Sequence, residues 1–385
     1  MIHNPLPLAI ELVQTPSITP ADHGCQEILI RHLAALGFTI HRCRFGVVDN
    51  FYARLGSTGR NFCFAGHSDV VTPGATDQWQ FPPFAGSLHN GHLIARGICD
   101  MKGALAAMVT AVARFLAERP DFAQHDSLSF LVTGDEEGDA VDGTVRILEW
   151  LASRQESLDY CLVGEPTSSA ILGDCIKNGR RGSLNGRLTL HGVQGHVAYP
   201  HLAANPIHAA MTALDHLTRH AFDAGNADFD PTSLQWTAIN AGGSATNVVP
   251  ATLTAAFNIR FNTEQTPATL EHTLRHILDQ AVAACGPRFS YTLDLTVTGL
   301  PFRTPEGPFL AAMRRAIRSV TGQEALLSTG GGTSDARFIA RSCPQTIEFG
   351  LVGTTMHKIN EQCPVADLEQ LTRVYHHLLG EIFAI

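Results

Sequence analysis

The sequence has no pair of cysteines at Cys-x-x-Cys spacing, although it contains nine cysteines among its 385 residues. The number is odd, and the cysteines are scattered along the whole chain. Disulfide frameworks and thiolate zinc sites depend on regularly spaced cysteines, so we expect neither. Unpaired cysteines suit a reducing compartment, and we therefore expect a cytoplasmic protein.

A long apolar run and an excess of positive charge are also missing. No apolar stretch is long enough to span a bilayer, and the first residues lack the unbroken apolar run of a signal peptide because Glu11 interrupts them. The formal net charge of -9 argues against nucleic acid or an anionic membrane as a partner. A small anionic substrate remains compatible with this charge, because a few local arginines are enough to bind one.

The composition is that of an ordinary globular protein, with 44% hydrophobic residues and a mean hydropathy near zero. The length exceeds the usual size of one hydrophobic core, so we expect two domains. The sequence shows no internal repeat of fixed period and no low-complexity segment.

Strand-like and helical segments alternate through the first part of the chain. Such alternation predicts an α/β fold with a mostly parallel sheet covered by helices on both faces. We expect the first helix to open at residues 19–22 and to end at Gly37. The expected strands are 39–45, 50–55, 61–65, 127–133 and 158–164. Two further helices are expected at 103–118 and 142–152.

The pattern changes near Arg181 to the order βαββαβ, which is that of a small ferredoxin-like domain. Its two helices are predicted to begin at Asn205-Pro206 and Thr266-Pro267, where a capping side chain precedes a proline at the first helical position. Afterwards the α/β pattern resumes. We therefore expect a discontinuous domain, 1–181 and 299–385, interrupted by an inserted domain, 182–298.

Asp100 lies after a strand-like run and before the predicted helix 103–118. Open α/β sheets bind their ligands at such strand-to-helix junctions. For an isolated aspartate the alternative reading, a simple helix cap, is the better one. Further acidic residues and histidines that follow strands favour a binding site instead.

His67 and Asp69 follow an apolar strand two residues apart, so both can face the same side. A histidine whose second ring N–H is accepted by a carboxylate is typical of a metal ligand, although many such pairs are only surface pairs. Glu136 and Glu137 follow another strand. One of them can bind a metal while the other takes a proton from water, and the alternative is a solvated acidic turn.

Glu165 ends a further apolar strand, and His357 lies in the segment 353–358. These two residues complete a set of histidines and carboxylates at strand ends or in the loops beyond them. Oxygen and imidazole donors without thiolates suit zinc, cobalt or manganese.

The chain resembles the M20 family of metallo-aminoacyl hydrolases over nearly its whole length, and within that family the branch that removes succinyl groups. Each motif alone is a weak indication, whereas the set is specific. The motifs are Gly66-His67-Ser68-Asp69-Val70-Val71, Arg96-Gly97-Ile98-Cys99-Asp100-Met101-Lys102-Gly103, Asp135-Glu136-Glu137, Gly164-Glu165-Pro166, Gly195-His196-Val197-Ala198-Tyr199-Pro200 and Gly331-Gly332-Thr333-Ser334-Asp335.

The resemblance implies a di-zinc catalytic domain and an inserted lid domain through which two chains form a homodimer. It implies two zinc ions per subunit, for which cobalt can substitute, bridged by Asp100. One zinc would also bind His67 and Glu165, and the other would bind Glu137 and His357.

The resemblance also implies how the reaction proceeds. Glu136 would act as the general base, accepting a proton from the water that attacks an amide carbonyl, and Asp69 would orient the first metal histidine. The oxyanion would be stabilised by a metal and by His196 of the partner subunit. The alternative for this histidine is an ordinary turn residue.

The substrate that the resemblance implies is N-succinyl-L,L-2,6-diaminopimelate, hydrolysed to succinate and L,L-2,6-diaminopimelate in lysine and diaminopimelate biosynthesis. Its carboxylates require arginines and amide or backbone donors, although Arg181 and Arg260 could instead form interdomain salt bridges. The positions that match substrate-binding residues of the family are Arg181, Tyr199, Asn247, Arg260, Gly332 and Thr333.

The sequence departs from the family pattern at Gly353, where some members carry asparagine four residues before the last metal histidine. The departure removes a possible carboxylate contact and leaves another deacylation, such as that of N-acetylornithine, as the main alternative. A non-catalytic family member is the alternative from another class. Its signature would be a missing ligand or base, and all of them are present.

Overall fold

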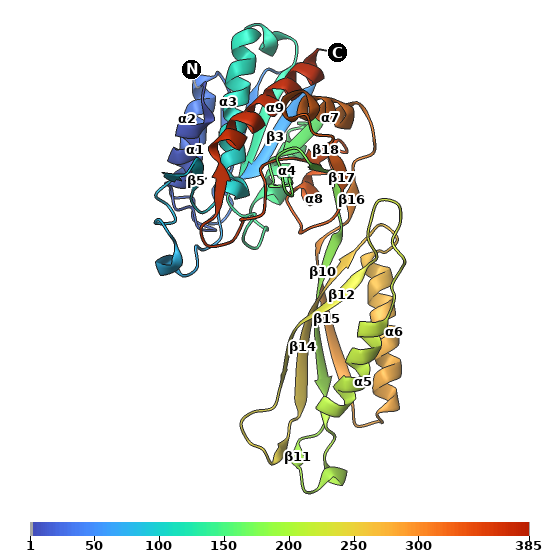
Figure 1. Ribbon diagram of the computed structural model, residues 1–385. Coiled ribbons are helices and arrows are strands. Elements are labelled where there is room, and N and C mark those ends of the chain that lie inside the picture. Colours follow the sequence, from blue (N-terminus) through green and yellow to red (C-terminus); the bar gives the residue numbers. More distant parts are fainter. Residues whose placement is uncertain (1–2, 385) are drawn as a thin grey trace. The chain divides into compact units, whose positions relative to one another are not determined.

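A computed structural model describes residues 3–384 (Figure 1). By its internal contacts the chain divides into two units. The first comprises the part up to Gly179, Arg303–Ser328 and the part from Ser334 onward, and the second comprises Arg180–Phe302 and Thr329–Thr333. The chain passes between the units in two short strands that pair with each other, β9 (Gly179–Arg180) and β16 (Phe302–Arg303).

The first unit is built on a mixed, mostly parallel sheet, which confirms the expected α/β fold. The pairs β3 with β6, β3 with β7 and β18 with β7 are parallel, and β1 and β2 add an antiparallel edge. In sheet order the strands are β1 (Thr39–Arg42), β2 (Phe51–Leu55), β6 (Ser127–Thr133), β3 (Asn61–His67), β7 (Tyr160–Val163), β18 (Thr346–Glu348), β8 (Cys175–Lys177) and β17 (Leu326–Ser328).

Helix α3 (Gly103–Glu118) is the central helix of this unit, and its bounds agree with the prediction. Residues 103–113 are all buried because α3 lies against the sheet and is flanked by α1 and α9, and Figure 1 shows it beside α9. The other helices are α1 (Pro5–Val13), α2 (Cys25–Ala35), α4 (Thr144–Ser153), α7 (Pro308–Thr321), α8 (Ala336–Ile339) and α9 (Val365–Phe383), with short 3-10 turns at Thr76–Gln78 and Phe122–Gln124.

Two expectations for this unit were wrong. The helix expected to open at residues 19–22 begins at Cys25, because His23 and Gly24 have positive φ angles of 50° and 86° that interrupt a helix. The strand before Asp100 does not belong to the central sheet. It is β5 (His92–Ile94), which lies between β4 (Ser87–His89) and β19 (Gln362–Pro364) in a small antiparallel sheet. Asp100 itself lies in an irregular helical turn, Ile98–Lys102, directly before α3.

The second unit is a four-stranded antiparallel sheet packed on two helices. Its sheet order, β12-β14-β10-β15, together with its chain order, is that of a ferredoxin-like fold. Asn205 and Thr266 cap the two helices as predicted, each accepting a backbone N–H. The elements are β10 (Gly182–His191), β11 (Gly195–His196), a 3-10 turn (Pro200–Leu202), α5 (Pro206–Arg219), β12 (Ser233–Ala241), β13 (Val248–Val249), β14 (Thr252–Phe261), α6 (Pro267–Ala284) and β15 (Ser290–Gly299).

Among residues 3–384, none of the helices combines the length and the apolar character needed to cross a membrane. All nine cysteines are free thiols, and eight of them are buried.

Candidate metal centre and active site

The parallel strands β3 and β7 end side by side, so that His67, the last residue of β3, and Glu165, two residues after β7, lie at the same edge of the sheet. The glycines that precede these two residues leave room for another segment. A Cβ on Gly66 or on Gly164 would lie only 2.1 or 2.6 Å from Cε of Met101. The segment that carries Met101 therefore packs directly over the ends of both strands.

Asp100 precedes that methionine, and its two carboxylate oxygens face two different histidines. Oδ1 lies 3.1 Å from Nε2 of His67, and Oδ2 lies 3.3 Å from Nε2 of His357. The same nitrogen of His357 lies 2.8 Å from Oε1 of Glu137, and Nε2 of His67 lies 3.9 Å from Oε1 of Glu165. The five predicted metal ligands thus converge around one shared carboxylate.

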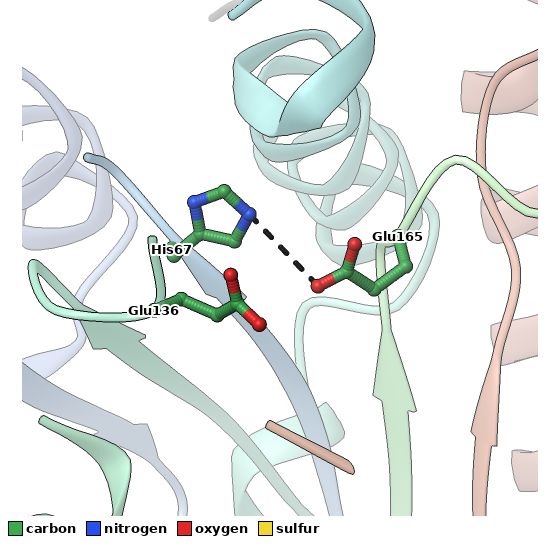
Figure 2. A group of neighbouring side chains, drawn as sticks. All are labelled: His67, Glu136 and Glu165. Carbon is green, nitrogen blue, oxygen red and sulfur yellow. Dashed lines mark ion pairs between the residues drawn. The ribbon is translucent and has the colours of Figure 1, made fainter. Parts of the chain in front are cut away.

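The donor set fits metal ions. Ligand atoms of His67, Asp100 and Glu137 lie within 4.8 Å of one another, as do those of His67, Glu136 and Glu165 (Figure 2). Oε1 of Glu165 is buried and accepts no hydrogen bond, which is costly for a carboxylate unless a cation completes its surroundings. Imidazole and carboxylate donors without sulfur are those of zinc and similar divalent cations.

The pKa values of these groups reflect the concentration of buried charge. Burial, followed by repulsion from Asp100, raises the pKa of Glu165 well above its usual value. Burial also raises the pKa of Glu136. The pKa of His357 is raised to about 10 by its hydrogen bonds with Asp100 and Glu137. Since a histidine must lose its proton to bind a metal, metal binding at this centre competes with protons.

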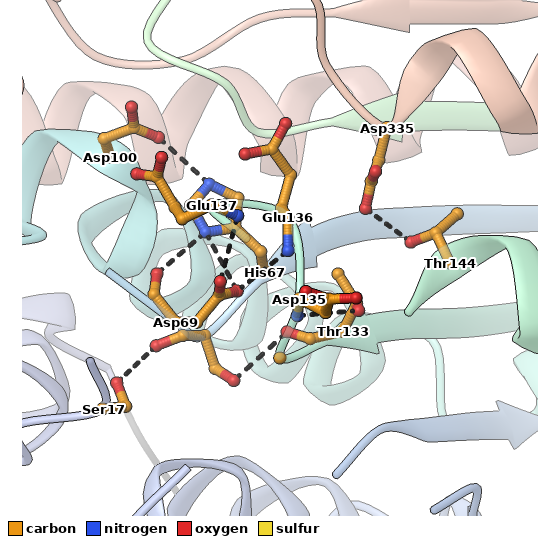
Figure 3. Close-up of polar contacts among 12 residues, drawn as sticks. Ser17, His67, Asp69, Asp100, Thr133, Asp135, Glu136, Glu137, Thr144 and Asp335 are labelled. Carbon is orange, nitrogen blue, oxygen red and sulfur yellow. Dashed lines mark hydrogen bonds and ion pairs between the residues drawn. The ribbon is translucent and has the colours of Figure 1, made fainter. Parts of the chain in front are cut away.

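The contact between Asp69 and His67 differs from the expected one. Nδ1–H of His67 donates to the backbone carbonyl of Asp69 at 2.9 Å, whereas the carboxylate lies farther away, at 3.6 Å. This hydrogen bond leaves Nε2 directed at Asp100. The carboxylate instead accepts the backbone N–H groups of Glu136 at 3.3 Å and Glu137 at 3.0 Å (Figure 3). Asp69 therefore orients the histidine through its backbone and holds the two glutamates through its side chain.

Arg337 is a site residue that the sequence analysis missed. It lies in the short helix α8, its side chain is 8% exposed, and its Nη1 lies 3.9 Å from Oε1 of Glu136. The preceding Asp335 accepts a hydrogen bond at 2.6 Å from the hydroxyl of Thr144, the first residue of α4. The signal that could have indicated it is the position of Arg337, two residues after the predicted Gly331–Asp335 motif.

The other predicted site residues lie in the second unit, in two groups. His196, Tyr199 and Asn247 are exposed at one end. The rings of His196 and Tyr199 are 5.8 Å apart, and the carbonyl of Asn247 accepts the N–H of Val197.

The second group lies at the other end of β10. Arg181 directly precedes this strand, and Arg260 lies opposite Ser183 at its start. Gly332 and Thr333 belong to the same unit. Arg180, next to Arg181, donates to the carbonyl of Gly330 at 3.2 Å. At about 3.3 Å per residue, ten-residue β10 keeps the two groups apart, so they cannot contact one small substrate within a single copy of this unit.

The sequence profile of Peptidase family M20/M25/M40 matches residues 63–381. This chain belongs to that family. The chain is 62% identical over 380 residues to a protein of Magnetococcus marinus named succinyl-diaminopimelate desuccinylase, with 99% of this chain and 98% of the relative covered. It is 50% identical over 375 residues to a protein of the same name from Nitrosospira multiformis, with 97% of each covered.

Solved M20 structures share the fold at low sequence identity. An M20 family metallo-carboxypeptidase of Sulfolobus solfataricus superimposes with a TM-score of 0.79 at 17% identity, covering 98% of this chain and 99% of that one. The YXEP protein of Bacillus subtilis, described as a dinuclear metal binding peptidase of the M20 family, has a TM-score of 0.75 at 15% identity, covering 99% and 98%. The resemblance seen in the motifs is thus confirmed.

Proposed function

We propose that this chain hydrolyses the amide bond of N-succinyl-L,L-2,6-diaminopimelate to give succinate and L,L-2,6-diaminopimelate, a step of lysine and diaminopimelate biosynthesis in the cytoplasm. The main support is the position of the buried Asp100 between two histidines, in a chain that is 62% identical to a relative named for this reaction. Comparing turnover of this substrate with turnover of N-acetylornithine tests the proposal.

Two zinc ions are proposed to occupy the centre, with Asp100 as the shared ligand. His67 and Glu165 would complete one site, and Glu137 and His357 the other. Two bound zinc ions would lower the pKa of a water molecule toward neutrality and polarise the substrate carbonyl. Cobalt would support the same chemistry, because it accepts the same nitrogen and oxygen donors.

The chain's own residues carry the proton transfers. Glu136 accepts a proton from the attacking water and returns it to the nitrogen of the leaving amine, so that one carboxylate serves as base and then as acid. Its backbone is held by Asp69, and Arg337 provides a positive charge beside its carboxylate. These contacts keep the base in a fixed position, as general-base catalysis requires.

Substrate carboxylates are proposed to bind to Arg181 and Arg260, with the Gly332-Thr333 backbone as a further donor. Tyr199 and Asn247 lie at the other end of β10, so they are proposed to join the same substrate site from a second copy of the chain. Guanidinium groups suit this role because they bind carboxylates through two parallel hydrogen bonds.

The packing around residue 353 explains why this chain has glycine there instead of asparagine. A Cβ at this position would lie 2.8 Å from the carbonyl oxygen of Pro166, so asparagine would not fit without a shift of the backbone.

We propose that the first unit is the catalytic domain and that the second unit is a lid through which two chains form a homodimer. β12 is one of the two edge strands of the lid sheet, and most of its length is exposed, including Ile239 at 54%. A long, exposed edge strand can pair with a second copy. Dimerisation would also allow His196 of the partner subunit to take part in the reaction.

A mixed dimer tests the origin of this histidine. The activity of each single variant, His196→Ala or Glu136→Gln, should be lower than that of the parental protein by about 100-fold or more. In a purified dimer with one subunit of each kind, one site has both residues intact if His196 acts across the dimer, so activity should return to about half the parental value. A mixed dimer as inactive as its parents would contradict the assignment.

A further inference from the structure

Glu361 is a fully buried carboxylate that collects four hydrogen-bond donors. Its Oε2 accepts from Nη1 of Arg96 at 2.6 Å and from the backbone N–H of Gly97 at 3.1 Å. Its Oε1 accepts from the backbone N–H groups of Cys99 at 2.8 Å and Asp100 at 3.3 Å. All four donors come from the segment that carries the proposed shared metal ligand.

Arg96 links this arrangement to the other side of the centre. It is 2% exposed, and its Nη2 donates to the backbone carbonyl of His357 at 3.4 Å. Its guanidinium lies 5.4 Å from the ring centroid of Trp79, whose indole N–H donates to a backbone carbonyl. Although Arg96 and Glu361 are 265 positions apart in the sequence, together they bind the backbones of both ligand segments.

The local backbone explains why these contacts are needed. The turn Ile98–Lys102 is irregular, with φ and ψ of -125° and 94° at Asp100, so neither a strand nor a regular helix holds it. Gly97 precedes the turn with a φ of 84°, and a Cβ there would lie 2.4 Å from Cγ1 of Val70. The buried carboxylate therefore satisfies N–H groups that regular secondary structure would otherwise satisfy.

We propose that Arg96 and Glu361 are a positioning pair that holds Asp100 and His357 in place for metal binding. A buried ion pair is a weak source of stability, because removing two charges from water offsets most of their attraction. The role of the pair here is to fix the positions of the ligand segments, since groups that orient metal ligands contribute to metal affinity. This inference rests on the metal centre of the proposed function.

The pair does not act equally on all ligands. His67 is the last residue of β3 and Glu165 follows β7, and the central sheet holds both strands independently of Glu361. Asp100 and His357 lie in segments that the pair contacts directly. Losing the pair should therefore weaken most the zinc site that contains His357.

The test compares zinc binding by metal-free Glu361→Gln with binding by the parental protein, using competition with a chromophoric chelator. Glutamine keeps the size of the side chain but leaves Arg96 without a negative partner. We expect the dissociation constant of the zinc site that contains His357 to rise by about 10- to 100-fold. Unchanged zinc affinities in a folded variant would overturn the proposal, whereas a parental protein that binds no zinc would refute the proposed metal centre itself.

The matched control is Glu156→Gln. Glu156 also pairs with an arginine, Arg54, and hydrogen-bonds Tyr52 at 2.8 Å, but it contacts Asn61 at the start of β3 rather than His67 at its end. This variant should lower the melting temperature and leave zinc affinity within about twofold, because no ligand is displaced. Equal losses of zinc affinity in both variants would mean a general structural effect and would also overturn the proposal.

Amide hydrogen exchange tests the same contacts without a variant, in case Glu361→Gln does not fold. The N–H groups of Gly97, Cys99 and Asp100 donate to a buried acceptor, so in the metal-free parental protein they should exchange as slowly as core strand amides. Exchange as fast as that of exposed loops would show that the pair does not hold this turn.

Discussion

Replacing Glu136 with glutamine should lower kcat for the succinyl substrate by about 10²- to 10⁴-fold, the usual contribution of a positioned acid–base group. Glutamine has the same shape but cannot take a proton from water. Glu136 is not one of the five proposed ligands of the two zinc sites, so zinc content should remain at the parental level. Steady-state kinetics and metal analysis of the same preparation measure both effects.

The control for this variant is Glu149→Gln. Glu149 is a solvent-exposed residue of α4 that pairs with Arg146 one helical turn away, and its replacement should leave kcat unchanged. A Glu136→Gln enzyme with a near-parental kcat would contradict the assignment of the base. A variant that had also lost zinc would instead make Glu136 a ligand.

Asp100→Asn should remove most of the bound zinc, and activity should disappear with it. A carboxylate offers one oxygen to each of two cations, whereas an asparagine side chain offers one oxygen and one NH₂ group, which only donates. The loss of affinity should exceed the about 10- to 100-fold loss that follows removal of an outer-shell partner. Metal analysis after dialysis against a weak chelator measures it.

Asp159→Asn is the matched control for this substitution. Asp159 accepts the backbone N–H of Asn61, at the end of β3 opposite to His67. Its replacement should leave two zinc ions per chain. If Asp100→Asn also kept two zinc ions, the carboxylate would not be the shared ligand.

Local patterns were sufficient to predict the parts of the fold that depend on neighbouring residues. The apolar run at 103–118 predicted α3, and the pairs Asn205-Pro206 and Thr266-Pro267 marked the starts of α5 and α6. Both patterns act through backbone geometry and capping within a few residues. The ferredoxin-like order followed from them.

Local patterns could not predict contacts between segments that are far apart in the sequence. The strand before Asp100 pairs with β19, more than 260 residues later, so the sequence could not show that it lies outside the central sheet. The motif placed Asp69 beside His67, but the hydrogen bond through the backbone carbonyl depends on the path of the loop. Arg337 and Glu361 reach the centre only through tertiary packing.

The most direct test of the account is steady-state hydrolysis of N-succinyl-L,L-diaminopimelate beside N-acetylornithine, using chelator-treated protein before and after zinc is added back. We expect no turnover without metal, and zinc-dependent turnover of the succinyl substrate with little of the acetyl one. Zinc-dependent turnover of N-acetylornithine alone would contradict the proposed substrate while leaving the metal centre in place. Turnover that does not depend on metal would contradict the mechanism.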